Sequence, residues 1–429
     1  MKLALFPLPL VAAALPLVTF TPSIPAPDVP DDDQVEALIA EFFELGARAT
    51  GEERTRQLTI LDTLDGLPPL DRRGEKRLRE DLIELWMEGP TLEKKGRNFL
   101  WEDPDRGLYI VNGKTKKPKG LLIGMHGGGA GVGDASTMSG PMSGGVSAHK
   151  WVGVYPEVLE RTEHGWTDSG TEEFVVELID RAVRTFGVDW NRVYLSGHSM
   201  GGYGTWTLGA HHADLVAGLA AAAGAPTPVL DRGTDEIVDI DWGVVPNLRN
   251  TRFVVYQSTD DPKVPADVNQ FAAKRVAQAA EEWGGYEEFE YWEVSGQGHG
   301  HPPGGYDDFF ERIEDFERNP YPTKIVWQPV LSWKRQFHWL TWETPTVAAL
   351  VVAEVDRKAG EIRIECDREV SGMGVLLNDE LVDLDEPLRV LLNGEVVFEG
   401  AIPPPSTATL VATGVSGDPG RTYAVEVTW

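Results

Sequence analysis

Cysteine and positive charge are scarce in this 429-residue sequence. Cys366 is the single cysteine, which excludes an intramolecular disulfide. It ends an alternating segment that begins at Ile362, and we expect it to be a small core residue. Lysine and arginine number 39 against 68 aspartate and glutamate, giving a formal net charge of −29 at pH 7. This acidity argues against nucleic acid and anionic membrane surfaces as partners.

A long hydrophobic run occurs at the N-terminus, from Leu3 to Phe20, after one basic residue and before a proline-rich acidic stretch. Prolines interrupt the run, so it favours a secretory signal over the alternative, a membrane anchor. Small residues at Ala12-Ala13-Ala14 and at Ala26 leave the cleavage position open. We therefore expect residues 1–28 to be a signal peptide and linker, the protein to be secreted or periplasmic, and no stable membrane insertion after processing.

The remaining chain divides into three parts by its hydrophobic periodicity. Residues 29–95 have helical spacing and are predicted to form a helical N-terminal extension. Residues 96–320 alternate short apolar runs with amphipathic helices, which indicates a mostly parallel sheet covered by helices. Residues 321–429 carry short strands and turn signals, including the hairpin signal Asn393-Gly394, and predict an all-β, sandwich-like domain.

The motif Gly197-His198-Ser199-Met200-Gly201 follows the apolar run Val193–Leu195 and opens a helical segment. A strand, a sharp turn and a helix are the context of the G-x-S-x-G nucleophile elbow, which lifts a serine hydroxyl above a sheet. The sequence therefore predicts Ser199 as the nucleophile of a serine hydrolase.

A glycine-rich turn, His126-Gly127-Gly128-Gly129, directly follows another apolar run. Glycines allow backbone N–H groups to approach a substrate carbonyl. We expect an oxyanion hole formed by Gly127 or Gly128 together with Met200, the residue after the nucleophile. His126 is expected to brace this loop.

A serine nucleophile also needs a carboxylate that orients its base. Asp260 and Asp261 follow the apolar run Phe253–Tyr256. Asp261 is favoured because the pattern D-x-x-V-P begins there, and Asp260 remains the rival.

The candidate base is His299, in a glycine-rich loop after another strand pattern, with His301 as the competitor. His198 is expected to point away from Ser199. No acidic residue adjoins the two loop histidines at a ligand-like spacing, so neither a metal nor another cofactor is expected.

Residues 96–320 resemble the secreted α/β-hydrolases, which include polyhydroxybutyrate-depolymerase-like, feruloyl-esterase-like and dienelactone-hydrolase-like proteins and, as a related group, the catalytic domain of prolyl-oligopeptidase-type peptidases. The resemblance is carried by MHGGG at 125–129, DWNRVYLSGHSMGGYGTW at 189–206, DDPKVP at 260–265 and GQGHG at 296–300. It implies an α/β-hydrolase fold and an acyl-enzyme mechanism with Ser199, Asp261 and His299.

A serine esterase acting on a small-molecule or polymer-linked ester is the favoured hypothesis. Residues 224–250 are too few for a large lid, which suits a bulky substrate. Two alternatives stay open: a prolyl-oligopeptidase-like serine peptidase, and an inert carbohydrate- or polymer-binding protein on a hydrolase scaffold. The oligomeric state is not predicted.

Overall fold

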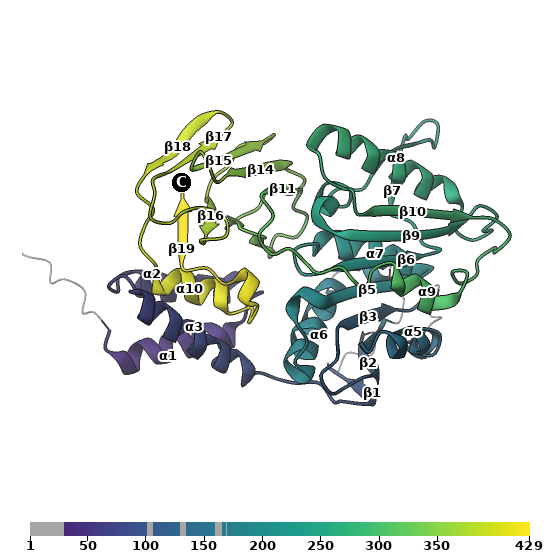
Figure 1. Cartoon of the computed structure of the whole chain (residues 1–429), viewed down its shortest axis with the longest axis horizontal. Coiled ribbons are helices and arrows are strands. Elements are labelled where there is room, and N and C mark those ends of the chain that lie inside the picture. The colour runs from purple at the N-terminus through teal and green to yellow at the C-terminus, as the bar shows by residue number, and fades with distance from the viewer. Residues whose placement is uncertain (1–29, 101–105, 129–133, 159–164, 169) are drawn as a thin grey trace, which may run out of the picture.

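The computed structural model describes residues 30–100, 106–128, 134–158, 165–168 and 170–429. The predicted signal segment, residues 1–28, and Gly129 of the glycine-rich turn lie outside the described residues. In Figure 1 the chain forms two halves: an α/β half with a large sheet on the right, and a half with helices below β-sheets on the left.

The large sheet has eight strands in the order β1-β2-β4-β3-β5-β6-β9-β10. The β1–β2 and β2–β4 pairs are antiparallel, and the pairs from β4 to β10 are parallel. The strands are β1 (Gly96–Phe99), β2 (Arg106–Gly113), β3 (Leu121–Met125), β4 (Val152–Val158), β5 (Val193–His198), β6 (Gly218–Ala222), β9 (Arg252–Ser258) and β10 (Phe289–Val294). With helices on both faces, this is the predicted α/β-hydrolase fold.

Alternating side chains of the strands contact different helices on the two faces of the sheet. In β9, Phe253 and Val255 belong to one core with α6, α7 and α8, whereas Val254 and Tyr256 belong to another with α4, α5 and α9. These helices are α4 (Ser136–Ser139), α5 (Ser143–Ala148), α6 (Thr171–Phe186), α7 (Met200–His211), α8 (Ala266–Trp283) and α9 (Gly305–Glu311). Burial on both faces explains the continuous apolar runs in the sequence.

Shorter elements complete this half. A two-stranded hairpin, β7 (Pro228–Leu230) and β8 (Ile237–Ile240), lies between β6 and β9 in the chain and contacts α8, where Arg275 pairs with Asp239 at 3.0 Å. Single turns of 3-10 helix occur at Gly165–Thr167, Trp190–Arg192, Pro246–Asn250 and Pro419–Arg421.

The C-terminal part contains two sheets that share one hydrophobic core. The five-stranded sheet consists of β11 (Lys324–Trp327), β14 (Val351–Asp356), β15 (Glu361–Cys366), β17 (Leu388–Leu392) and β18 (Glu395–Gly400). The four-stranded sheet consists of β12 (Gln336–Phe337), β13 (Leu340–Trp342), β16 (Met373–Leu377) and β19 (Val425–Thr428). Asn393 and Gly394 both have positive φ between β17 and β18, as expected for the predicted hairpin.

One helix departs from the expectation of an all-β C-terminal region. Helix α10 (Thr407–Gly414) is capped by Ser406, whose side chain accepts a hydrogen bond from the Thr409 N–H. Its threonines and valine have weak helix propensity, so the sequence gives little local sign of it. Contacts with α2 and α3 stabilise the helix in place of propensity.

The N-terminal helices are α1 (Asp32–Leu45), α2 (Gly51–Asp65) and α3 (Arg72–Met87). Figure 1 places them beneath the C-terminal sheets and beside α10. Phe42, Ile60 and Leu82 lie in the same buried cluster as the sheet residue Trp327. The first helices that the structure describes and the C-terminal part therefore build one core, and these helices complete the β-rich half.

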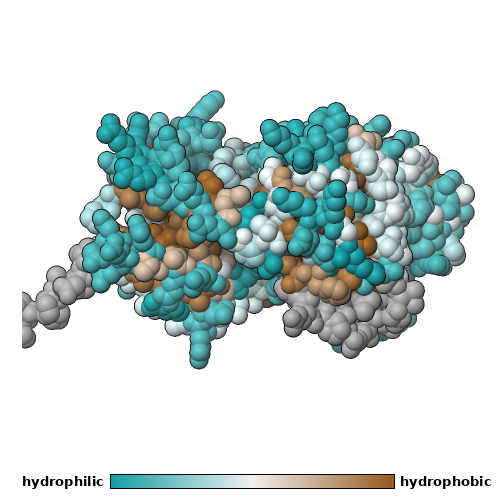
Figure 2. All heavy atoms as spheres, turned by 90° about the horizontal axis from the view of Figure 1, so that it is seen from below, coloured by the Kyte–Doolittle hydropathy of each residue, from teal (hydrophilic) through white to brown (hydrophobic). Residues whose placement is uncertain are grey.

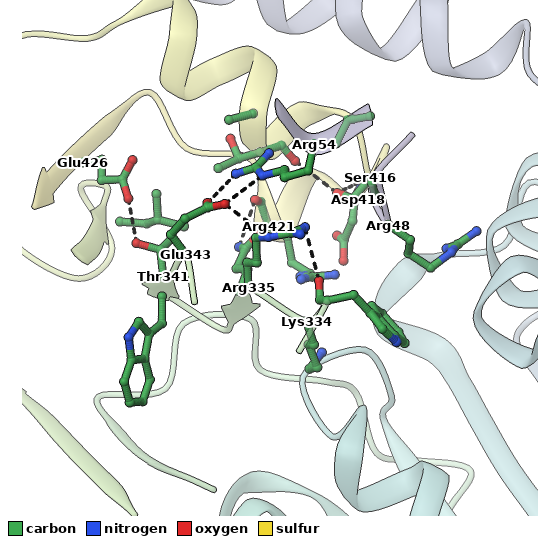
Figure 3. Close-up of a pocket in the computed structure, with 18 of the residues that line it drawn as sticks. Arg48, Arg54, Lys334, Arg335, Thr341, Glu343, Ser416, Asp418, Arg421 and Glu426 are labelled. Atoms are coloured by element: carbon green, nitrogen blue, oxygen red, sulfur yellow. Dashed lines mark hydrogen bonds and ion pairs between the residues drawn. The ribbon is translucent and has the colours of Figure 1, made fainter. Parts of the chain in front are cut away.

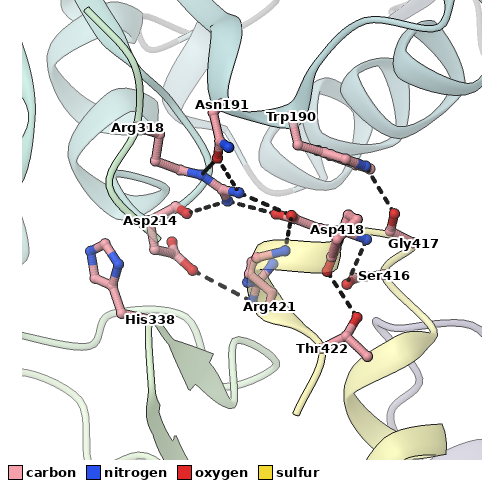
Figure 4. Close-up of polar contacts among 12 residues, drawn as sticks. Trp190, Asn191, Asp214, Arg318, His338, Ser416, Gly417, Asp418, Arg421 and Thr422 are labelled. Atoms are coloured by element: carbon pink, nitrogen blue, oxygen red, sulfur yellow. Dashed lines mark hydrogen bonds and ion pairs between the residues drawn. The ribbon is translucent and has the colours of Figure 1, made fainter. Parts of the chain in front are cut away.

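A buried polar network joins the two halves (Figure 4). Arg318, which follows α9, binds Asp418 through two hydrogen bonds of 2.6 and 2.9 Å, and it also reaches Asn191 and the Asp214 carbonyl. Both charged side chains are almost fully buried, at 2% and 1% exposure. Because burial keeps both side chains from water, the charge of each is compensated by the other.

Hydrophilic side chains cover most of the described surface seen from below in Figure 2, with smaller hydrophobic patches on both halves. Among the described residues, no helix is both long and apolar enough to cross a membrane.

Candidate active site

Ser199 stands between β5 and α7 with a strained backbone, φ 56° and ψ −120°. The flanking glycines are required by close packing. A Cβ on Gly197 would lie 2.1 Å from the Gly201 carbonyl oxygen, and one on Gly201 would lie 2.1 Å from the Met125 carbonyl oxygen. The turn predicted from the G-x-S-x-G pattern is thus present at the carboxyl end of the central strand.

Three predicted side chains meet at this edge of the sheet. His299, in the loop after β10, has its Nε2 atom 2.9 Å from Ser199 Oγ. Its other ring nitrogen, Nδ1, is 2.7 Å from Asp261 Oδ2. Because the carboxylate only accepts, the proton is assigned to Nδ1, and Nε2 is then the acceptor that faces the serine hydroxyl.

Asp261 is held by its own loop as well as by the histidine. Its side chain is fully buried, and Oδ1 accepts hydrogen bonds from the Lys263 and Val264 N–H groups at 2.8 and 3.0 Å. Both carboxylate oxygens therefore have partners, which fixes the direction in which Oδ2 presents itself to His299.

The rival carboxylate, Asp260, has a different place. Its Oδ1 accepts hydrogen bonds from the Ser258 hydroxyl and from the Gly296 and Gly298 N–H groups, the last two at 3.0 and 3.2 Å. These bonds lower the pKa of Asp260, the Ser258 hydroxyl contributing most. Asp260 thus ties the end of β9 to the loop that carries His299, a role that the sequence analysis missed.

The residues predicted for the oxyanion hole lie next to Ser199. A Cβ on Gly127 would approach the His198 carbonyl oxygen to 2.9 Å and the Ser199 Cβ to 3.2 Å, so this backbone passes directly against the elbow. Gly128 follows with a φ of 151°. Met200 is the first residue of α7, where backbone N–H groups lack an intrahelical acceptor.

His126 braces the loop from inside. Its Nε2 accepts a hydrogen bond from the Val158 N–H at 3.1 Å, its Nδ1 is 2.9 Å from the Gly127 carbonyl, and its own carbonyl accepts from Trp166 Nε1 at 2.9 Å. Burial lowers the pKa of His126, which keeps the ring neutral and suited to these bonds.

His198 lies between the two histidines of the β10 loop, its ring centroid 4.9 Å from that of His299 and 4.8 Å from that of His301. Its Nε2 is 3.3 Å from the Gly300 carbonyl. Burial, together with the neighbouring His301 and His299, lowers the pKa of His198 to about 4. A neutral His198 packed on His299 is a feature that the motif itself gave no sign of.

The Ser199 hydroxyl is hydrogen-bonded to His299, whereas the competitor His301 has its Nδ1 atom 3.3 Å from the Tyr306 hydroxyl. Within the described ranges, no group of three or more histidine, cysteine, aspartate or glutamate side chains is arranged to hold a metal ion.

An α/β-hydrolase fold with a serine, a histidine and an aspartate hydrogen-bonded in series defines the class of site. Neither a model of a protein family nor a curated protein sequence matches the chain. Similar solved structures include a thermostable esterase (19% identity, TM-score 0.36) and esterase 2 of Thermogutta terrifontis (13%, 0.37). A phospholipase/carboxylesterase from Dyadobacter fermentans is another (14%, 0.35).

The matched region covers 51% of this chain and 62% of the thermostable esterase, 53% and 93% for the Thermogutta protein, and 53% and 95% for the Dyadobacter protein. The chain thus spans about three fifths of the thermostable esterase's length. Because these TM-scores are low, the assignment of the α/β-hydrolase fold rests on the strand order of the large sheet.

Proposed function

We propose that this protein is a serine hydrolase that cleaves carboxylic esters through an acyl-enzyme on Ser199. The observation that carries the proposal is the unbroken hydrogen-bond series from Asp261 through His299 to Ser199, at 2.7 and 2.9 Å. This spacing is within the reach that proton transfer to a general base requires.

In the proposed reaction, His299 Nε2 takes the Ser199 proton while Oγ attacks the ester carbonyl carbon. The carbonyl oxygen becomes an oxyanion and accepts hydrogen bonds from the N–H groups of Gly127 or Gly128 and of Met200, each worth about 2.7–4 kcal/mol of transition-state stabilisation. The C–O bond then breaks, and the alcohol leaves with the proton from His299.

Water completes the cycle. His299 accepts a proton from the water molecule that attacks the acyl carbon, then returns it to Ser199 Oγ as the carboxylic acid leaves. Asp261 stabilises the imidazolium that exists during both transfers and holds the ring in place. The proposed chemistry thus uses these three side chains, the backbone N–H groups that face the oxyanion, and water.

A bulky or polymer-linked ester is the proposed substrate class. Support comes from the short segment between β6 and β9. It forms the β7–β8 hairpin, which pairs with α8 through Asp239 and Arg275, and it is too short to be a large lid that would exclude a bulky substrate. His299 keeps 14% of its side chain exposed.

We further propose that residues 1–28 direct export. The mature protein should then begin after Ala14 or Ala26, and N-terminal sequencing that finds an intact Met1 contradicts this.

The test is hydrolysis of aryl esters with acetyl, butyryl, feruloyl and hydroxyalkanoate acyl groups, beside amides of the same acids. We expect ester turnover, and a fall in kcat of about 10⁶ in Ser199→Ala. Ser147→Ala, an exposed serine on α5, is the matched control and should keep full activity. Amide turnover above ester turnover, or activity retained in Ser199→Ala, contradicts the proposal.

A further inference from the structure

A cavity of about 430 Å³ lies where α2, the Trp190 turn and the C-terminal part meet. Figure 3 shows several charged side chains pointing toward its centre. Trp190 comes just before β5 and Ser199 just after it, and six residues of strand span about 20 Å. The cavity is therefore at the opposite edge of the sheet from the candidate active site.

Basic side chains outnumber acidic ones in this cavity although the whole chain is strongly acidic. Five of the lining side chains are basic, Arg48, Arg54, Lys334, Arg335 and Arg421, and four are acidic, Asp180, Glu343, Asp418 and Glu426. Arg48 pairs with two carboxylates, Glu177 and Asp180, whereas Arg54 and Arg335 share Glu343. Glu426, whose pKa is raised by burial, accepts a hydrogen bond from Thr341 on the same wall.

Lys334 and Arg421 also share one carboxylate, but the Arg421 guanidinium donates no hydrogen bond to any of the described residues. Asp214 binds Lys334 Nζ at 2.6 Å through Oδ1, and its Oδ2 is 3.4 Å from the Arg421 guanidinium. The other nearby carboxylate, Asp418, is already bound by Arg318 through two hydrogen bonds. One positive charge at Arg421 is thus only partly compensated.

Three buried polar atoms on the wall of this cavity have no hydrogen-bond partner within the described residues. They are Arg335 Nε, which faces Glu343 at 3.4 Å, Arg421 Nε and His212 Nδ1, and His212 is only 2% exposed. The His212 ring also stacks on Trp333, with centroids 5.7 Å apart and planes at 25°. Buried polar atoms without a protein partner call for a ligand or water, because leaving them unpaired costs free energy.

We propose that this cavity is a second binding site, which takes a small monocarboxylate with a flat apolar body. The carboxylate pairs with Arg421, and the body lies against Trp333. The site is distinct from the catalytic edge of the sheet.

The charge and shape of the cavity select this class of ligand. The Arg421 guanidinium, whose one charged contact is the 3.4 Å approach to Asp214, suits one negative charge, and its fork geometry matches the two oxygens of a carboxylate. A dianion would bring an excess of negative charge next to Asp214 and Asp418. The half-buried Trp333 ring offers an apolar face, and the volume lies within the range of small-molecule sites.

Binding is tested by calorimetry and by thermal unfolding of the full chain with Ser199→Ala, so that ester chemistry is silent. The probes are benzoate, its uncharged isostere benzamide, and acetate, which lacks the flat body. Benzoate should bind and raise Tm in proportion to its concentration, and both others should bind at least about tenfold more weakly.

Arg421→Gln should weaken benzoate binding by about tenfold or more. Trp333→Ala, at a half-buried position, gives a second variant in case Arg421→Gln does not fold, and it should weaken benzoate but leave acetate unchanged. Arg192→Gln, at a surface ion pair with Glu317, is the matched control and should bind normally.

Absence of benzoate binding, equal binding of benzamide, or unchanged binding in both cavity variants overturns the proposal. Unchanged binding in both variants, together with loss after a phosphonate occupies Ser199 in the wild-type protein, places the acid at the candidate active site instead. These outcomes do not depend on ester turnover, so this proposal can fail while the proposed function stands, and the reverse.

Discussion

Two clusters of bonded charges lie at opposite ends of β5, and they differ in how far they can change. At the carboxyl end, Asp261 is bound to His299, whose ring remains partly exposed. At the amino end, Asp418 is bound to Arg318, and both are almost fully buried. Histidine gains and loses a proton near neutral pH, whereas arginine does not.

In the proposed function, similar carboxylate bonding serves proton transfer in one place and holds two parts of the chain together in another. Asp261 Oδ1 and Asp418 Oδ1 each accept backbone N–H bonds, two from Lys263 and Val264 in one case and one from Gly420 in the other. The charged or titratable partner of each carboxylate, His299 or Arg318, decides whether the pair can transfer a proton. A histidine next to Ser199 can pass a proton on, while the guanidinium of Arg318 fastens two halves of the chain.

Changing Asp261 to asparagine should produce the largest loss among the variants that keep Ser199. The amide NH2 group takes the place of Oδ2 and donates to His299 Nδ1, which must then be unprotonated. The proton is left on Nε2, which then cannot accept the serine proton, and kcat should fall by about 10⁴. Steady-state hydrolysis of an aryl ester measures this. Asp267→Asn, an exposed aspartate at the start of α8, serves as control, and equal losses in both variants would exclude a special role for Asp261.

Arg318→Met should act on stability instead. It leaves Asp418 buried without its counter-charge, which costs about 3–5 kcal/mol of unfolding free energy. Arg192→Met removes an exposed pair on the adjacent turn and should cost about 0–1 kcal/mol. Urea unfolding compares the two; similar small costs would mean that the buried pair does not hold the halves together. At temperatures where Arg318→Met remains folded, its kcat should equal that of the wild type.

The Asp260 contacts predict an intermediate effect on activity. Asp260→Ala frees the Gly296–Gly298 backbone, and displacement of His299 by about 1 Å should lower kcat about 10²-fold. Asp260→Asn keeps an accepting oxygen and should restore most of the activity. If alanine and asparagine are equally active, or equally damaged, the loop is not positioned by this side chain.

The smallest predicted effect is a pH dependence of stability from His338, at the amino-end cluster. Burial is the main cause that lowers its pKa to about 4, against about 6.5 when unfolded. Between these values the unfolded chain binds more protons, so stability falls as pH drops from about 6.5 to 4, by up to about 1.4 kcal/mol per unit.

His338→Asn removes this titration and should make the decline with acidification shallower by that amount. Asparagine tolerates the positive φ of 52° at this position. Unfolding free energies at pH 7 and 5 measure the difference, and identical slopes in the two proteins would contradict a neutral buried His338.

The sequence predicted the α/β half of the molecule more fully than the other half. Ser199, Asp261 and His299 each follow a buried strand, and parallel strands bring their carboxyl ends to one edge, so order along the chain was enough to place them together. The bond between Asp260 and the Gly296–Gly298 loop depends on side-chain direction, which strand order does not specify.

The pairing of the two chain ends could not be predicted. Hydrophobic periodicity shows that α3 has an apolar face, but it does not say that Leu82 packs beside Gly414, more than three hundred residues away. Helix α10 was missed because its threonine-rich sequence favours no helix until α2 and α3 lie against it.

The most direct test of the account is labelling by a fluorophosphonate, followed by mass spectrometry of the modified peptide. The wild-type protein should carry one phosphonyl group on Ser199, Ser199→Ala should carry none, and Asp261→Asn should be labelled far more slowly. Labelling of Ser199→Ala at the wild-type rate, or modification of a different residue, would contradict the assignment of Ser199 as the nucleophile.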